Sequence, residues 1–99
     1  RNKMSSSNNI NQSSIPYNGW SNYETWLGNL WITNDEYNYS ILCEALKLDG
    51  DIYKKAEWLE QYYHSQLDEV VSEYSLWQDL IGRAFSLISW IEIVESNLE

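Results

Sequence analysis

Apolar side chains recur every three or four residues near the start of the chain, and this spacing restricts the possible fold more than any other feature. They are Tyr23, Trp26, Leu27, Leu30 and Trp31. On a helix these positions share one face. The stripe is too wide and too aromatic to remain in water, so other helices have to cover it. We therefore expect a helix over residues 22–33 whose apolar stripe is the structural core.

Three Ser-x-x-Glu/Gln patterns predict helix starts. In such a pattern the serine hydroxyl accepts from the amide three residues on, and that residue's side chain reaches back. The patterns begin at Ser21, Ser75 and Ser89. The first agrees with the apolar stripe, and the other two divide the end of the chain. We place a break at residues 86–89, and one long final helix is the alternative.

The two middle helices have other boundary signals. Asp35, or one of the two residues before it, can cap a second helix directly after the first. Gly50 suits a left-handed helix end, and Asp51 can cap a third helix that starts at Ile52. The inner face of the second helix is expected at Tyr39, Leu42, Cys43 and Leu46, with Tyr37, Ile41 and Ala45 at its flank. The third helix has no stop signal before Gly82, so its end stays open.

The remaining patterns complete the prediction of the fold. Residues 1–16 are rich in Ser and Asn and have too few apolar side chains to offset the entropy of ordering, so we expect a flexible tail. Arg1–Lys3 precede Met4 and look like an expression remnant. Residues 17–99 are predicted to form a single helical domain. The fold class is thus all-α, a compact bundle of about five short helices after a disordered N-terminal tail.

The charge balance limits the partners. Fifteen acidic residues stand against six basic ones, for a formal net charge of −9. Nucleic acid and anionic membranes repel such a chain, and basic surfaces attract it. We therefore expect neither direct nucleic-acid binding nor membrane binding, but a partner protein with a basic surface. The lone Cys43, with neither a leader nor a membrane span, predicts a cytoplasmic location.

Two motifs suggest a relationship to other proteins. The first is Asn22–Trp26, followed by Leu30-Trp31 and Asn34–Glu36, and the second is residues 79–85 followed by 89–93. Together they resemble a group of small, uncharacterised proteins encoded by phages, plasmids and other mobile elements. The resemblance covers roughly residues 18–95, with the middle helix unmatched. It implies a mobile-element origin and action in a host cell, but no particular activity.

Catalytic and metal-binding patterns are weak. Glu57, Glu60, His64 and Asp68 share a helix face and could approach a metal ion, but a bundle site needs a second such cluster, and no other helix has a histidine. We interpret the four residues as a solvated face. No phosphate loop, nucleophile–base arrangement or paired-cysteine site is present. We expect no enzyme, no catalytic residue, no metal and no cofactor.

Protein binding is the remaining function class. Fifteen aromatic residues are more than a domain of this size easily buries, and exposed aromatic side chains anchor many interfaces. The predicted aromatic anchors are Tyr17, Trp20 and Trp58. The predicted acidic contacts are Glu57, Glu60, Glu69, Glu73, Glu92, Glu95 and Glu99.

These residues support two hypotheses. In the first, the protein binds and inhibits a host nucleic-acid-handling defence protein, by protein–protein contact with an element of nucleic-acid mimicry. In the second, it is a non-enzymatic structural or regulatory homo-oligomer, such as a homodimer, in which the surplus aromatic side chains pair between copies. Salt separates the two hypotheses, because it weakens contact with a basic partner and favours association of two negative copies.

Overall fold

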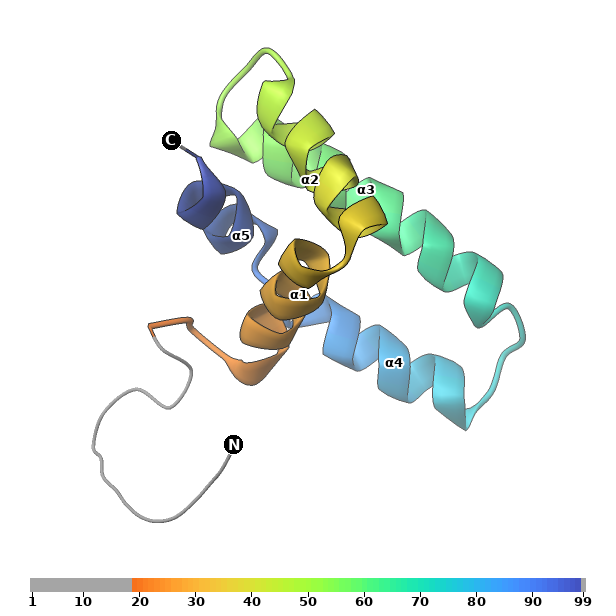
Figure 1. Cartoon of the computed structure of the whole chain (residues 1–99). Helices are drawn as coiled ribbons and strands as arrows, with labels where there is room; N and C mark the ends of the chain where they lie inside the picture. The colour runs from red at the N-terminus through yellow and green to blue at the C-terminus, as the bar shows by residue number, and fades with distance from the viewer. Residues whose placement is uncertain (1–18, 99) are drawn as a thin grey trace, which may run out of the picture.

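The computed structural model describes residues 19–98, and in this range the chain forms five α-helices and no strand (Figure 1). They are α1 (Tyr23–Asn34), α2 (Glu36–Lys47), α3 (Ile52–Val70), α4 (Leu76–Ser86) and α5 (Trp90–Asn97). The predicted all-α class and the five helices are confirmed, as is the break at residues 86–89. The tail predicted at residues 1–16 lies outside the described residues.

Each helix begins at a side chain that accepts a hydrogen bond from the amide three residues further on. The five capping residues are Asn22, Asp35, Asp51, Ser75 and Ser89. Such a cap stabilises a helix by about 1 kcal/mol, because it satisfies an amide that has no partner within the helix. Gly50 has a positive φ of 125°, as the predicted left-handed turn before α3 requires.

The first cap differs from the prediction. Asn22 rather than Ser21 accepts from the Thr25 amide, at 2.8 Å, so the box with Glu24 does not set the start of α1. The Ser21 amide instead donates to Glu92 Oε1 in α5, at 3.1 Å, and Asn22 Nδ2 donates to the Leu87 carbonyl oxygen, at 2.7 Å. Contacts with the end of the chain therefore decide between two neighbouring capping residues.

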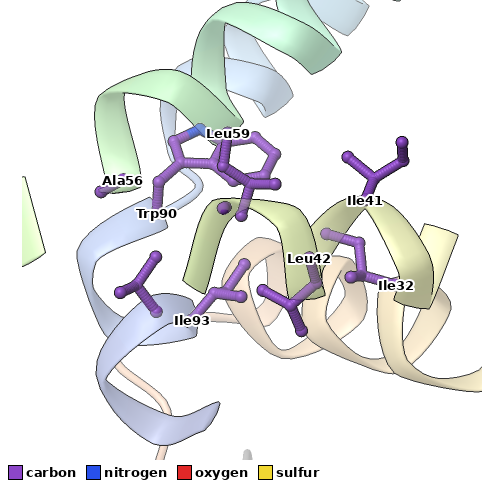
Figure 2. Close-up of a cluster of buried hydrophobic side chains, with 9 residues drawn as sticks. Ile32, Ile41, Leu42, Ala56, Leu59, Trp90 and Ile93 are labelled. Carbon is purple, nitrogen blue, oxygen red and sulfur yellow. The ribbon is translucent and has the colours of Figure 1, made fainter. Parts of the chain in front are cut away.

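The core lies between α1, α2, α5 and the first half of α3 (Figure 2). Its buried apolar residues are Ile32, Ile41, Leu42, Ala45, Ala56, Leu59, Trp90, Ile93 and Val94. Leu42, Leu59, Ile93 and Val94 are fully buried, and burial of each such side chain contributes about 1.5–3 kcal/mol. Helix α3 packs mainly on α5, and α1 packs mainly on α2.

The predicted core face of α1 is wrong. Tyr23, Leu30 and Trp31 are exposed, with 66% of Trp31 accessible, while Trp26 and Leu27 are only half-buried. The helix turns Thr25 and Ile32 inward instead. The small Gly28 lies on the same side, where an added Cβ would stand 3.6 Å from Ile93 Cδ1. Because small side chains let α5 approach α1 closely, the broad aromatic stripe faces away from the core.

The inner face of α2 also differs from the predicted one. Ile41, Leu42 and Ala45 are buried, whereas Tyr39 is exposed and Cys43 is half-buried with a free thiol. Asp35 is the single residue between α1 and α2 and caps α2. Its extended backbone turns the chain sharply, so the start of α2 is set by this joint and not by the apolar stripe alone.

Helix α4 stands apart from this core. Helix α3, whose end the sequence does not define, ends at Val70. The chain then turns through residues 71–75 and enters α4 at one edge of the molecule (Figure 1). None of the α4 residues is buried. The helix is held near its end, where the Phe85 ring contacts His64 at a centroid distance of 5.4 Å and Trp90 at 5.6 Å.

Candidate protein-binding surfaces

An apolar groove opens between α1, the second half of α3 and α4. Its volume is about 350 Å³. The side chains that line it include Trp31, Leu67, Val71, Ile81 and Phe85. Two polar side chains, Asn38 and Gln66, also reach its surface. A groove of this composition suits an apolar side chain or an amphipathic helix better than a charged ligand.

Aromatic rings hold one wall of the groove in place. Tyr63 stacks on Trp90 with ring centroids 5.6 Å apart and planes inclined by 9°. The Tyr63 hydroxyl donates to Asn38 Oδ1 at 2.7 Å. A tyrosine is protonated at neutral pH even at its usual pKa of about 10, and burial raises the pKa of Tyr63 further, so its hydroxyl keeps donating at alkaline pH as well. This wall of the groove is therefore preformed.

Next to the groove, α4 exposes a row of apolar side chains. Four of them, which we call the α4 strip, are Leu76, Trp77, Leu80 and Ile81. Trp77 is 64% accessible and Leu80 is 53% accessible. The polar residues of the helix, such as Gln78 and Asp79, point to its other side by helical spacing. This amphipathic helix thus leaves its apolar side largely in water.

Two of the predicted acidic contacts on α3, Glu57 and Glu60, lie on one exposed face. Together with Asp68 and His64 they line a polar depression. Within residues 19–98, the ion pair between His64 Nδ1 and Asp68 Oδ2, at 3.4 Å, is the only one. Among the described residues, Glu57 and Glu60 therefore have no ionic partner, and Asp68 has His64 alone.

The other predicted acidic contacts do not join this face as one surface. Glu69 and Glu73 are exposed near the end of α3 and in the turn after it, and Glu95 is exposed on α5. Glu92 is half-buried and accepts from the Ser21 amide, so it holds the start of α1 in place. Glu99 lies outside the described residues.

Comparison with known proteins agrees with the expectation of an uncharacterised family. Residues 13–94 match a family of unknown function, DUF7249. The chain belongs to this family. It matches no curated protein and no solved structure. The DUF7249 match spans all of α1 to α4 and most of α5, so the groove and the α4 strip both lie in the family region.

The predicted aromatic anchors of this DUF7249 protein are placed differently from the expectation. Trp20 and Trp58 are half-buried and pack on the core, with Trp58 stacked on Tyr62 at a centroid distance of 6.0 Å. Tyr17 lies outside the described residues. The strongly exposed aromatic residues are instead Trp31 and Trp77, together with Tyr23, Tyr37, Tyr39, Tyr53 and Tyr74. Sequence spacing predicts amphipathic helices, but it does not tell which of them stays uncovered.

Within residues 19–98, no group of three or more His, Cys, Asp or Glu side chains is placed to hold a metal ion. In the same range, no helix has both the length and the apolar character required to cross a membrane.

Proposed function

We propose that this DUF7249 protein is a small acidic binding protein of a phage or plasmid, which acts through contact with a basic surface on a host protein. The observation that carries the proposal is the exposed acidic face of α3, which has no lysine or arginine partner within residues 19–98. A net charge of −9 extends the attraction for a basic partner beyond direct contact. No catalytic group is needed for this role.

The host protein in this proposal handles nucleic acid as part of a defence system, and the bound inhibitor occupies its basic groove. Along the axis of α3, Glu57 and Glu60 are separated by about 4.5 Å, and Glu60 and Asp68 by about 12 Å. Duplex DNA has one charge per about 1.7 Å. Because the acidic face is much sparser in charge than a duplex, charge alone does not reproduce one. Exposed aromatic side chains such as Trp31, 66% accessible, supply the further contact area.

A charge-neutralising triple variant tests the proposal. Glu57→Gln, Glu60→Gln and Asp68→Asn, which neutralise the three carboxylates of the face, should release the partner captured from a host lysate. The matched control is Glu36→Gln, Glu44→Gln and Asp49→Asn, which removes as many exposed charges from α2 and its end. For the purified pair, the first variant should slow association and weaken its salt dependence, because long-range attraction acts mainly on encounter.

The control variant should retain binding close to that of the unmodified protein. Equal losses in both triple variants would mean that total charge matters and that the α3 face has no special role. Unchanged binding in both would refute a basic partner. A competition assay tests whether the protein occupies the nucleic-acid groove of its partner, because DNA or RNA should then displace the unmodified protein.

A further inference from the structure

Helix α4 is too short and too exposed to be stable by itself. It has 11 residues, whereas isolated helices below about 12–15 residues are marginal in water. A helix in a protein gains most of its stability from an apolar face packed on other elements. In α4 that support comes from Phe85 near the end, while the α4 strip (Leu76, Trp77, Leu80, Ile81) faces water. Within residues 19–98 of one copy the side chains of the strip remain 40–64% accessible, so a further surface that covers them would stabilise α4.

We propose that the α4 strip is the interface between two copies of this chain, with their α4 helices packed antiparallel across a two-fold axis. This surface is separate from the acidic face of α3, so the inference goes beyond the proposed binding of a host protein. A second copy can cover this strip with its own strip, because a two-fold axis pairs identical surfaces of two chains.

The exposed area has the size that a dimer needs. The apolar side chains with the highest exposed fractions near the strip are Tyr74 (89% accessible) and Val70 (80%). Together with the strip they offer roughly 400–650 Å² of apolar surface, if an aromatic side chain is taken as 150–250 Å² and an aliphatic one as 60–120 Å². Apolar atoms make up about 65% of a homodimer interface. With the polar atoms included, each copy would therefore bury about 600–1,000 Å² of surface, which is the range found for stable interfaces.

The order of residues in α4 favours the antiparallel arrangement. With the two-fold axis near residues 81–82, Leu80 of each copy meets the small Ala84 of the other, which is exposed in the single chain. Asp79 and Arg83 flank the strip on one edge, at equal distances from residue 81. An antiparallel pair brings the same edges together, so Asp79 of one copy lies beside Arg83 of the other.

Arg83 supports this pairing in a second way. It is the only lysine or arginine after Lys55, and it has no ion-pair partner within residues 19–98 although Asp79 is one helical turn away. Two copies with a net charge of −9 each repel one another at long range. Salt screens this repulsion, so the dimer should form more readily as the ionic strength rises, because exposed pairs such as Asp79–Arg83 offset it by at most about 1 kcal/mol each.

Sedimentation velocity of the full chain at low and high salt tests the dimer. The unmodified protein should sediment as a dimer at micromolar to millimolar concentration. Leu80→Ser should raise the dissociation constant by at least about tenfold. The matched control Leu30→Ser changes an exposed leucine on α1, outside the strip, and should leave the dissociation constant unchanged. Near-ultraviolet circular dichroism verifies that the core remains folded in each variant.

A pair of charge-reversed variants tests the antiparallel geometry. Asp79→Lys and Arg83→Glu should each dimerise about tenfold more weakly than the unmodified protein, because like charges then face each other. An equimolar mixture should recover the dimer, since both cross-pairs are opposite in sign in the mixed dimer. Repulsion within one helix cannot produce this recovery, because each variant keeps its own helix unchanged on mixing.

Three results would overturn the inference. A folded monomer at millimolar concentration and high salt would show that the α4 strip is not an interface between two copies. The same conclusion would hold if a helix of another protein were then found to bind through Leu80. An unchanged dissociation constant for Leu80→Ser would place the dimer interface elsewhere. Failure of the mixture to recover the dimer would exclude the antiparallel arrangement. None of these results depends on whether a host protein binds the acidic face of α3.

Discussion

Thr25 is the one polar side chain fully buried within residues 19–98. It is tolerated there because its hydroxyl oxygen accepts from the Ser89 amide, at 2.8 Å, and so also satisfies the start of α5. Trp90 is the contrasting case, since its buried indole N–H has no acceptor in the same part of the chain. A buried donor without a partner costs about 1–3 kcal/mol. Packing of the Trp90 ring on Tyr63 and Phe85 offsets this cost.

The tyrosines beside Trp90 should make stability fall at alkaline pH. Burial raises the pKa of Tyr63, and the 2.7 Å hydrogen bond with Tyr37 raises that of Tyr62. Above a pH of about 10 the unfolded chain loses these protons while the folded chain retains them, so unfolding becomes more favourable as pH rises. Urea unfolding between pH 8 and 11 measures this loss.

Tyr63→Phe should reduce the alkaline loss of stability, at the cost of the hydrogen bond with Asn38, about 1 kcal/mol at every pH. Tyr53→Phe removes an exposed phenol and is the control. The same pH dependence in both variants would mean that the buried phenol is not responsible.

At the scale of elements, α1 and α5 are joined at their starts. The segment before α1 bonds to Glu92 and Leu87, and Ser89 bonds to Thr25. Two helices that are far apart in sequence thus satisfy each other's free amides. The arrangement explains why Glu92 and Asn22, whose positions suit local helix capping, also form long-range hydrogen bonds.

Two neighbouring alanine variants test which residue caps α1. Asn22→Ala should destabilise the protein by about 1–2 kcal/mol, because it removes the cap and the bond to Leu87. Ser21→Ala should cost at most a few tenths of a kcal/mol, since the main-chain amide that donates to Glu92 is retained. Thermal unfolding of the two variants measures the difference. A larger loss in Ser21→Ala would restore the capping box with Glu24 as the helix start.

At the scale of the molecule, charge opposes compactness. Fifteen acidic residues and a net charge of −9 sit on a chain of 99 residues, and His64 with Asp68 forms the one ion pair seen between residues 19 and 98. Few attractive pairs therefore balance the mutual repulsion of the carboxylates. Such repulsion destabilises the folded state and is reduced by salt.

The melting temperature at pH 7 should consequently rise when sodium chloride is increased from about 0.01 to 0.15 M, as the screening length falls from about 30 to 8 Å. Differential scanning calorimetry at a fixed protein concentration checks the direction. The variant with Glu36→Gln, Glu44→Gln and Asp49→Asn has less repulsion to screen and should respond less. A melting temperature that falls with salt would mean that unseen attractive pairs dominate.

Local chemistry was sufficient to predict the helical class, most of the boundaries and the acidity. Asp35, Asp51, Ser75 and Ser89 cap helices as expected, because a capping bond spans only three residues and needs no distant partner. The acidic character that motivates a basic partner likewise follows from composition alone.

The tertiary structure alone decided which faces are buried. Tyr23, Leu30 and Trp31 have the spacing of a core stripe, yet α5 packs against Thr25 and Gly28 on another side of the same helix. Periodicity measures how amphipathic a helix is, but burial depends on which elements arrive and how closely their side chains permit contact. For the same reason the uncovered side of α4, with Trp77 and Leu80, emerged only once the other four helices were placed.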